Sequence, residues 1–210
     1  MAFVRISELS QHVGAVVSVP GWVVTTRSSG KIAFCVMRDG TGNLQTVFPK
    51  NEVVEGAWER FATLTQEACI TVTGTVREDA RAPGGYELTA SDVVVTAPSV
   101  DYPISPKEHG TAFLFEHRHL WLRSKKQVAI ARVRHEIEQA IHDFYYARGF
   151  IRVDTPILTG SIGEQAGELF ATEYFDLGQA YLAQTGQLYG EAAAAAHGKI
   201  YTFGPTFRAE

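Results

Sequence analysis

Apolar and polar residues alternate along most of the first hundred positions, which is the pattern of half-buried β-strands. Turn sequences separate the alternating runs, for example Asp39-Gly40-Thr41-Gly42 and Ala82-Pro83-Gly84-Gly85. One stretch, 52–64, instead carries apolar residues at helical spacing. We therefore expect a helix between the third and fourth of five strands, at 13–25, 31–38, 43–48, 68–77 and 86–96. This order is that of the OB-fold β-barrel, which commonly binds single-stranded nucleic acid across its second and third strands.

The hydrophobic pattern changes its period in the second half of the chain. From 125 to 148 the apolar residues recur at helical spacing, which predicts a long amphipathic helix ended by Gly149 in a left-handed conformation. A strand at 150–153 follows, with Pro156 soon after it. The prolines between 98 and 109 indicate a linker. The whole is predicted to be α+β, with a barrel domain at 1–100, a linker at 101–116 and a second domain at 117–210.

Composition and charge narrow the function only a little. The 210 residues are 45% hydrophobic and 20% charged, with a net charge of −4, so the chain can bury real cores and is not a globally basic nucleic-acid binder. Its two cysteines, Cys35 and Cys69, lack the spacing of a metal site and are expected to be reduced core residues. The N-terminus has no secretory signal pattern, and no apolar run is long enough for a membrane helix. We expect a cytoplasmic protein.

The last eleven residues combine strand character with two charged side chains. If 200–210 is one strand, Arg208 and Glu210 point to the same face, because side chains two positions apart do so. A guanidinium that grips phosphate beside a carboxylate that accepts from an amine suits a nucleotide-activating site. An ordinary ion pair at the end of a strand is the alternative.

The second strand of the barrel leaves one question open. Both of its faces are mostly apolar, so the pattern does not tell whether Phe34 points outward or into the core, and burial favours the core. Arg27, Lys31 and Arg38 form a local basic cluster around it.

These motifs together resemble a known family. The sequence Phe207-Arg208-Ala209-Glu210 is similar to the second signature motif of class II aminoacyl-tRNA synthetases, and the preceding 201–206 is similar to its asparaginyl form. The long helix, Gly149, strand and Pro156 resemble the first signature motif. The resemblance implies that Arg208 is catalytic and binds ATP with Glu210, that Mg²⁺ arrives with ATP rather than on ligands of this chain, and that a homodimer forms through 125–156.

The resemblance also implies roles for residues that the patterns alone would not single out. The glycine-rich 159–170 segment resembles a loop that closes over the amino acid, with Glu164 binding its ammonium group, although Gln165 stands where the family usually has Gly. Gln187 matches a substrate-binding glutamine; taken alone it is a polar residue early in an alanine-rich helix. In the barrel, Phe34 matches an aromatic residue on which an anticodon base stacks, while Arg27 and Gln45 match residues that hold or read the anticodon.

One difference separates the asparaginyl from the aspartyl branch of the family. Aspartyl enzymes carry Pro and Lys where this chain has Gly186 and Gly190, and that Lys pairs with the substrate carboxylate. Without the cation, burying a carboxylate would cost several kcal/mol, whereas a neutral carboxamide needs no counter-charge. The resemblance therefore implies tRNA, L-asparagine and ATP as partners. The alternatives are an aspartyl enzyme of relaxed tRNA choice and a non-catalytic tRNA-binding module.

The third signature motif of the family is missing from the 210 residues. We therefore expect the sequence to be the N-terminal part of a longer enzyme, and the 210 residues alone to be inactive.

Overall fold

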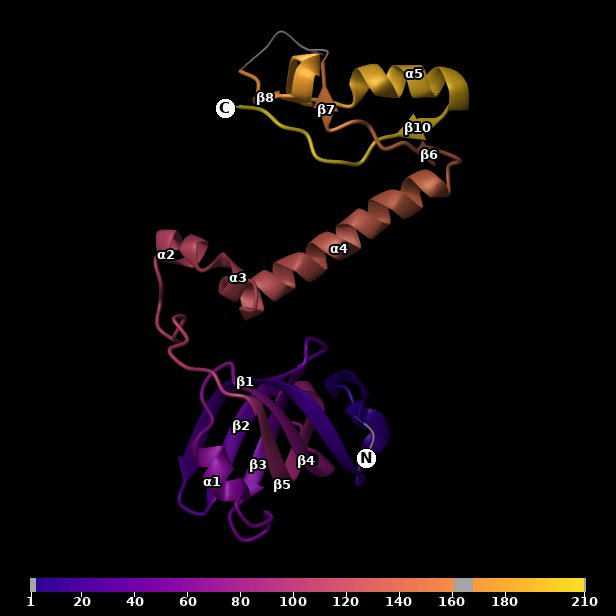
Figure 1. The fold of residues 1–210 in the computed structure, drawn as a ribbon. Helices are drawn as coiled ribbons and strands as arrows, with labels where there is room; N and C mark the ends of the chain where they lie inside the picture. The colour runs from indigo at the N-terminus through magenta and orange to yellow at the C-terminus, as the bar shows by residue number, and fades with distance from the viewer. Residues whose placement is uncertain (1–2, 161–167, 210) are drawn as a thin grey trace. The chain divides into compact units, whose positions relative to one another are not determined.

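The computed structural model describes residues 3–160 and 168–209, and the chain divides into two compact units, Met1–His117 and Arg118–Glu210. Five strands of the first unit close into a barrel in the order β1-β2-β3-β5-β4 (Figure 1). All neighbours are antiparallel except β3 and β5, which run parallel. The predicted OB-fold is thus confirmed, with strands β1 (Val16–Ser29), β2 (Ile32–Arg38), β3 (Asn43–Pro49), β4 (Cys69–Glu78) and β5 (Tyr86–Ala97).

The barrel interior is filled by the inward-facing half of each alternating strand. Phe48, Met37 and Leu44 are among its largest fully buried side chains, and branched residues of β1, β4 and β5 complete it. Gly74 lies where the β4–β5 register shifts, and a Cβ there would collide with the Thr89 carbonyl oxygen. Glycine at this bulge therefore lets two strands approach closely as the barrel closes.

The helical parts of the first unit differ from the expectation in two ways. The predicted helix at 52–64 is shorter, α1 (Ala57–Ala62), because Gly56 before it has a left-handed φ of 77°. A 3-10 segment that the pattern did not reveal, η1 (Ile6–His12), buries Leu9 in the core. The unit also contains η2 (Pro83–Gly85) and α2 (Thr111–Glu116).

Asp39 ties η1 to the turn between β2 and β3. Its carboxylate accepts hydrogen bonds from the backbone N–H groups of Ile6 (2.7 Å), Thr41 (2.8 Å) and Gly42 (3.2 Å), and from the Thr41 hydroxyl (2.7 Å). Partial burial raises the pKa of Asp39, but these four donors outweigh it and hold the pKa below its usual value.

The second unit begins with α3 (Arg118–Trp121) and the long helix α4 (Lys125–Tyr146). Ser124 caps α4 by accepting from the Gln127 N–H at 3.4 Å, and Gly149 beyond its end has the predicted left-handed φ, 74°. None of the described helices is long and apolar enough to cross a membrane.

Short strands and one further helix complete this unit. β6 (Ile151–Arg152) pairs in parallel with β10 (Ile200–Tyr201), and β9 (Gln179–Leu182) lies between β7 (Leu158–Thr159) and β8 (Ala171–Glu173). A 3-10 turn, η3 (Phe175–Leu177), joins β8 to β9, and α5 (Gln187–His197) follows β9. Tyr201 fixes β10 to α4, since its ring stacks on Tyr145 at 4.5 Å and its hydroxyl bonds His142 Nδ1 at 2.8 Å.

Candidate functional site

The structure shows which face of β2 carries Phe34. Ala33, Cys35 and Met37 are fully buried, so the alternate residues lie on the outer face, where Phe34 is half-buried. Burial among the core residues had favoured the opposite placement, and that expectation is wrong. The barrel has enough large residues from β3, β4 and β5 to fill its interior without Phe34.

Arg27, Phe34 and Gln45 come together on this outer face. Arg27 pairs with Phe34 across β1 and β2, and its Cζ lies 4.4 Å from the ring centroid. Arg27 Nη2 donates to Gln45 Oε1 at 3.5 Å, and Gln45 Nε2 donates to Glu87 Oε2 at 3.3 Å. The result is a patch, here called the Arg27–Phe34 patch, that offers a ring, a cation and an oriented amide side by side.

Glu87 was missed by sequence reasoning. It reaches the patch through the parallel pairing of β3 with β5, where it lies opposite Gln45. No local pattern signals a contact between strands that are 42 residues apart. Its carboxylate fixes which way the Gln45 amide points.

The predicted basic cluster is smaller than the sequence suggested. Arg38 makes a two-bonded ion pair with Glu67, Nη1–Oε1 at 2.6 Å and Nη2–Oε2 at 2.8 Å, and the Glu67 side chain is only 7% exposed. Glu67 adopts a left-handed φ of 68°, which is unusual for a residue other than glycine. Arg38 is therefore a structural ion-pair partner, and Arg27 and Lys31 remain as the cations for an anionic ligand.

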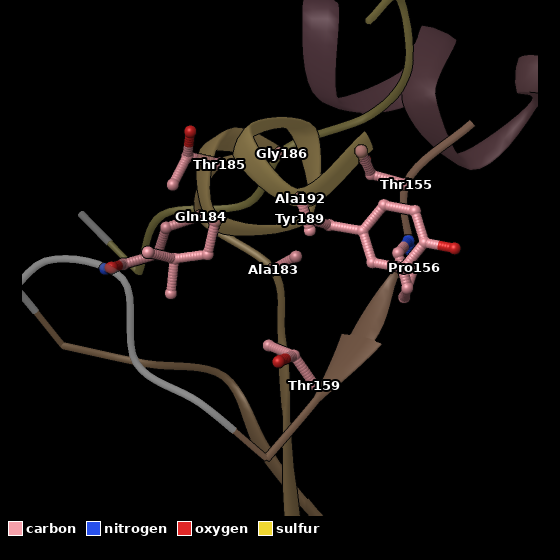
Figure 2. Close-up of a pocket in the computed structure, with 10 residues that line it drawn as sticks. Thr155, Pro156, Thr159, Ala183, Gln184, Thr185, Gly186, Tyr189 and Ala192 are labelled. Atoms are coloured by element: carbon pink, nitrogen blue, oxygen red, sulfur yellow. The ribbon is translucent and has the colours of Figure 1, made fainter. Parts of the chain in front are cut away.

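In the second unit, the start of α5 forms one wall of a cavity of about 300 Å³ (Figure 2). The cavity lies between the β7 segment and α5, and both polar and apolar side chains line it. Threonine hydroxyls and the Gln184 amide are among the polar groups. The lining residues include Thr155, Pro156, Thr159, Gln184, Thr185 and Tyr189.

Gln187 is the first residue of α5. Its backbone N–H donates to Thr185 Oγ1 at 3.1 Å, and its side-chain Nε2 donates to Glu191 Oε1 at 3.0 Å. The side chain is exposed, so a ligand amide or carboxylate can reach it.

Gly190 is buried one turn further along the helix. A Cβ at this position would lie 3.7 Å from Ile200 Cδ1 and 3.9 Å from Thr202 Cγ2, which are ordinary contacts. A longer side chain at 190 would therefore start out along β10.

The end of the chain departs from the predicted continuous strand. Regular pairing stops at Tyr201, because the residues that follow include Gly204 and Pro205, and proline has no N–H to donate. The chain then returns to the sheet region, with Phe207 N–H donating to the Ala183 carbonyl at 3.0 Å and Ala209 N–H to the Glu168 carbonyl at 3.4 Å. Arg208 lies exposed between these two anchors. Glu164, Gln165 and Glu210 lie outside the described residues.

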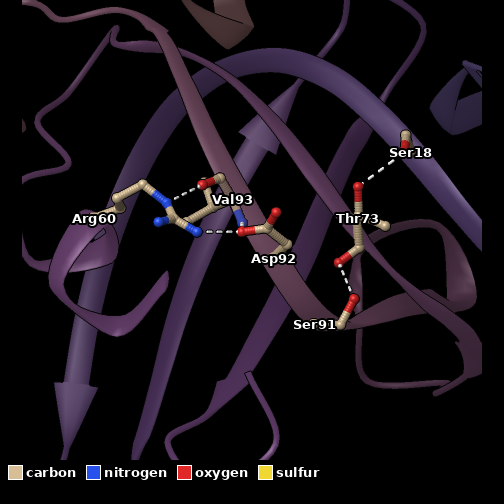
Figure 3. A network of polar contacts seen from close by, with 6 residues as sticks. All are labelled: Ser18, Arg60, Thr73, Ser91, Asp92 and Val93. Atoms are coloured by element: carbon tan, nitrogen blue, oxygen red, sulfur yellow. Dashed lines mark hydrogen bonds and ion pairs between the residues drawn. The ribbon is translucent and has the colours of Figure 1, made fainter. Parts of the chain in front are cut away.

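Polar contacts elsewhere on the barrel join α1 to β5 and connect β4 with its neighbours β1 and β5 (Figure 3). Arg60 of α1 donates to the Val93 carbonyl at 2.7 Å and to Asp92 Oδ1 at 2.5 Å, which attaches α1 to β5. Nearby, the Ser18 and Thr73 hydroxyls lie 2.8 Å apart, and Ser91 bonds the Thr73 carbonyl. Every one of these contacts joins two elements of the barrel, so we assign the network a structural role.

Two known protein families match different parts of the chain. The profile of the tRNA synthetases class II (D, K and N) matches residues 111–210, and that of the OB-fold nucleic acid binding domain matches residues 17–96. The chain belongs to the class II tRNA synthetases of the D, K and N group. The class II resemblance of the signature motifs is thereby confirmed.

Within these class II synthetases, individual relatives match over both units. The chain is 53% identical to an asparagine–tRNA ligase of Thermus thermophilus and 51% identical to one of Chloroflexus aurantiacus, over 99% and 98% of its length. The crystal structure of asparaginyl-tRNA synthetase from Pyrococcus horikoshii complexed with asparaginyl-adenylate matches with a TM-score of 0.92 at 35% identity, covering all of this chain and 49% of that one. The chain spans about half the length of the curated relatives it matches, 48% and 47%.

Proposed function

We propose that the full-length protein is an asparagine–tRNA ligase. It activates L-asparagine with ATP and transfers the asparaginyl group to its tRNA. The observation that carries this proposal is the identity of more than half of the aligned residues with asparagine–tRNA ligases, continuous across both units.

The proposed reaction has two steps. In the first, the asparagine carboxylate attacks the α-phosphorus of ATP and pyrophosphate leaves. In the second, a ribose hydroxyl of the tRNA's terminal adenosine attacks the acyl carbon and AMP leaves. The enzyme contributes positioning and charge stabilisation rather than a covalent intermediate. Arg208 holds the α-phosphate, with Glu210 beside ATP, and Glu164 and Gln187 hold the amino acid.

Selection of asparagine over aspartate is proposed to rest on α5. Gly190 brings no cation to the helix, and a Cβ there would point toward Ile200 and Thr202. A substrate carboxylate would meet no counter-charge from this position, while a carboxamide requires none.

Mg²⁺ is proposed to come with the phosphates of ATP. Within 3–160 and 168–209, no group of three or more His, Cys, Asp and Glu side chains is placed to hold a metal ion.

The Arg27–Phe34 patch is proposed to bind the anticodon. The Phe34 ring on the outer face can stack on a base, Arg27 can neutralise a phosphate, and the Gln45 amide, oriented by Glu87, can hydrogen-bond a base edge. This division of tasks matches the requirements of single-stranded RNA recognition.

The enzyme is proposed to be a cytoplasmic homodimer formed through 125–156. Ile130, Val133, Ile137 and Phe144 of α4 are 42–59% exposed in the described chain, which is an unusual amount of apolar surface for one helix.

Cys35 and Cys69 are free thiols, as in proteins of a reducing compartment.

Aminoacylation tests the proposal directly. The full-length enzyme, total tRNA, ATP and radiolabelled amino acids are combined, and the label on the tRNA is measured. We expect asparagine to be attached and aspartate not. Attachment of aspartate in place of asparagine would favour the aspartyl alternative, and attachment of neither would favour the binding-module alternative.

A further inference from the structure

The backbone conformation of Gly186 does not require glycine, but the space around it does. It precedes α5 with φ −87° and ψ 6°, values open to any L-residue. A Cβ at this position, however, would lie 2.9 Å from Thr155 Oγ1, 3.0 Å from Thr155 Cγ2 and 3.4 Å from Thr155 Cβ. The side chain of Thr155 thus occupies the space that a residue at 186 would need.

Thr155 is poorly able to move away. As a β-branched residue it has few χ1 rotamers, and Pro156 restricts its backbone to extended conformations. All three close atoms belong to this short, stiff side chain and none is the end of a flexible one. The Thr155 side chain therefore leaves no room for a Cβ at 186, between the segment before β7 and the first turn of α5.

The first turn of α5 carries Gln187, the residue proposed to bind the amino acid. Gly186 O accepts the first helical hydrogen bond, from Gly190 N–H at 2.8 Å, and Gln187 follows it directly. Thr155, Thr185 and Gly186 all line the same cavity (Figure 2). A shift at 186 would move Gln187 and the Thr185 hydroxyl that bonds its N–H.

We propose that Thr155 is a positioning residue for asparagine activation, because its side chain fills the space beside Gly186 and so fixes the first turn of α5 and hence Gln187. The inference rests on the proposed function, in which Gln187 binds the amino acid. Thr155 is inferred to act through its volume and not its hydroxyl. The effects of substitutions at 155 and 186 on KM for asparagine are therefore expected to depend on each other.

A double-mutant cycle in the full-length enzyme tests the coupling. Gly186→Ala is expected to raise KM for asparagine by roughly ten- to a hundredfold, as small misplacements of binding groups do, with KM for ATP changed much less. Thr155→Ala removes Oγ1 and Cγ2, so the double variant is expected to recover KM for asparagine to within about threefold of the unmodified enzyme. Thr155→Val keeps the shape without the hydroxyl and should behave like the unmodified enzyme.

Gly110→Ala is the matched control. Gly110 also precedes a helix and has a negative φ, −65°, but a Cβ there would meet nothing within 4 Å. The rise in melting temperature on adding asparagine provides a readout independent of turnover: Gly186→Ala should lose it, and the double variant should regain it.

The proposal fails if Gly186→Ala behaves like Gly110→Ala, if the two changes simply add, or if Thr155→Val is as damaging as Gly186→Ala. Poor folding of Gly186→Ala that Thr155→Ala does not correct would also overturn it. An unmodified enzyme that shows no asparagine-dependent pyrophosphate exchange would instead refute the proposed function.

Discussion

At the scale of single residues, the position of Phe34 separates a binding role from a packing role. Because its ring lies on the outer face against Arg27, Phe34→Ala should weaken tRNA binding by about 1–3 kcal/mol, the usual contribution of a stacked base. The melting temperature should change little. Phe48→Ala is the contrast, since Phe48 is fully buried and its truncation should cost about 3–5 kcal/mol of unfolding free energy. A Phe34→Ala enzyme that is strongly destabilised but still binds tRNA normally would contradict the assignment.

Asp39 makes the stability of the barrel depend on acid. Its pKa is lowered in the folded state, so the stabilisation from its four hydrogen bonds is fully present above the usual pKa of about 4 and is lost as the pH falls through the lowered value. Asp39→Ala should destabilise the barrel by about 1–3 kcal/mol at pH 7. Urea unfolding at a series of pH values measures this. If the Asp39→Ala variant loses as much stability below a pH of about 4 as the unmodified protein does, groups other than Asp39 cause that loss.

At the scale of elements, α4 carries the proposed dimer contact. Val133→Asp places a charge on a side chain that is 59% exposed, so the fold should survive while association weakens. Sedimentation of the full-length enzyme should change from dimer to monomer. Arg132→Asp, on the adjacent position of the same helix, controls for charge alone. Equal dissociation by both variants, or by neither, would argue against an apolar dimer face on α4.

Elements were predictable where their pattern was local. The five strands and α4 follow from alternation, helical spacing and the Gly149 stop. α1 was predicted too long because the apolar stripe continues past Gly56, whose left-handed backbone ends any helix there. The strand predicted at 200–210 stops at Tyr201, since Gly204 and Pro205 cannot continue the pairing.

The candidate sites show the same limit. Arg27, Phe34 and Gln45 were named from a family resemblance, and the structure brings them into one patch. Their partner Glu87, and the space that Thr155 fills beside Gly186, depend on residues that meet only in three dimensions. The neutralisation of Arg38 by Glu67 was hidden for the same reason.

At the scale of the whole molecule, we propose that the barrel and the second unit are separate domains, at 1–100 and 117–210, joined by a linker at 101–116. Limited proteolysis of the full-length enzyme should cut first within 98–110, where prolines and irregular backbone leave the chain accessible. Mass spectrometry of the early fragments gives the site. First cuts inside the strands of the barrel would contradict this division.

The proposed function depends most directly on which amino acid the whole enzyme activates. Pyrophosphate exchange with full-length protein, ATP and either asparagine or aspartate measures kcat/KM for both substrates under the same conditions. We expect kcat/KM for asparagine to exceed that for aspartate by at least about a hundredfold, because Gly190 supplies no counter-charge for a substrate carboxylate. A kcat/KM for aspartate equal to or above that for asparagine would contradict it.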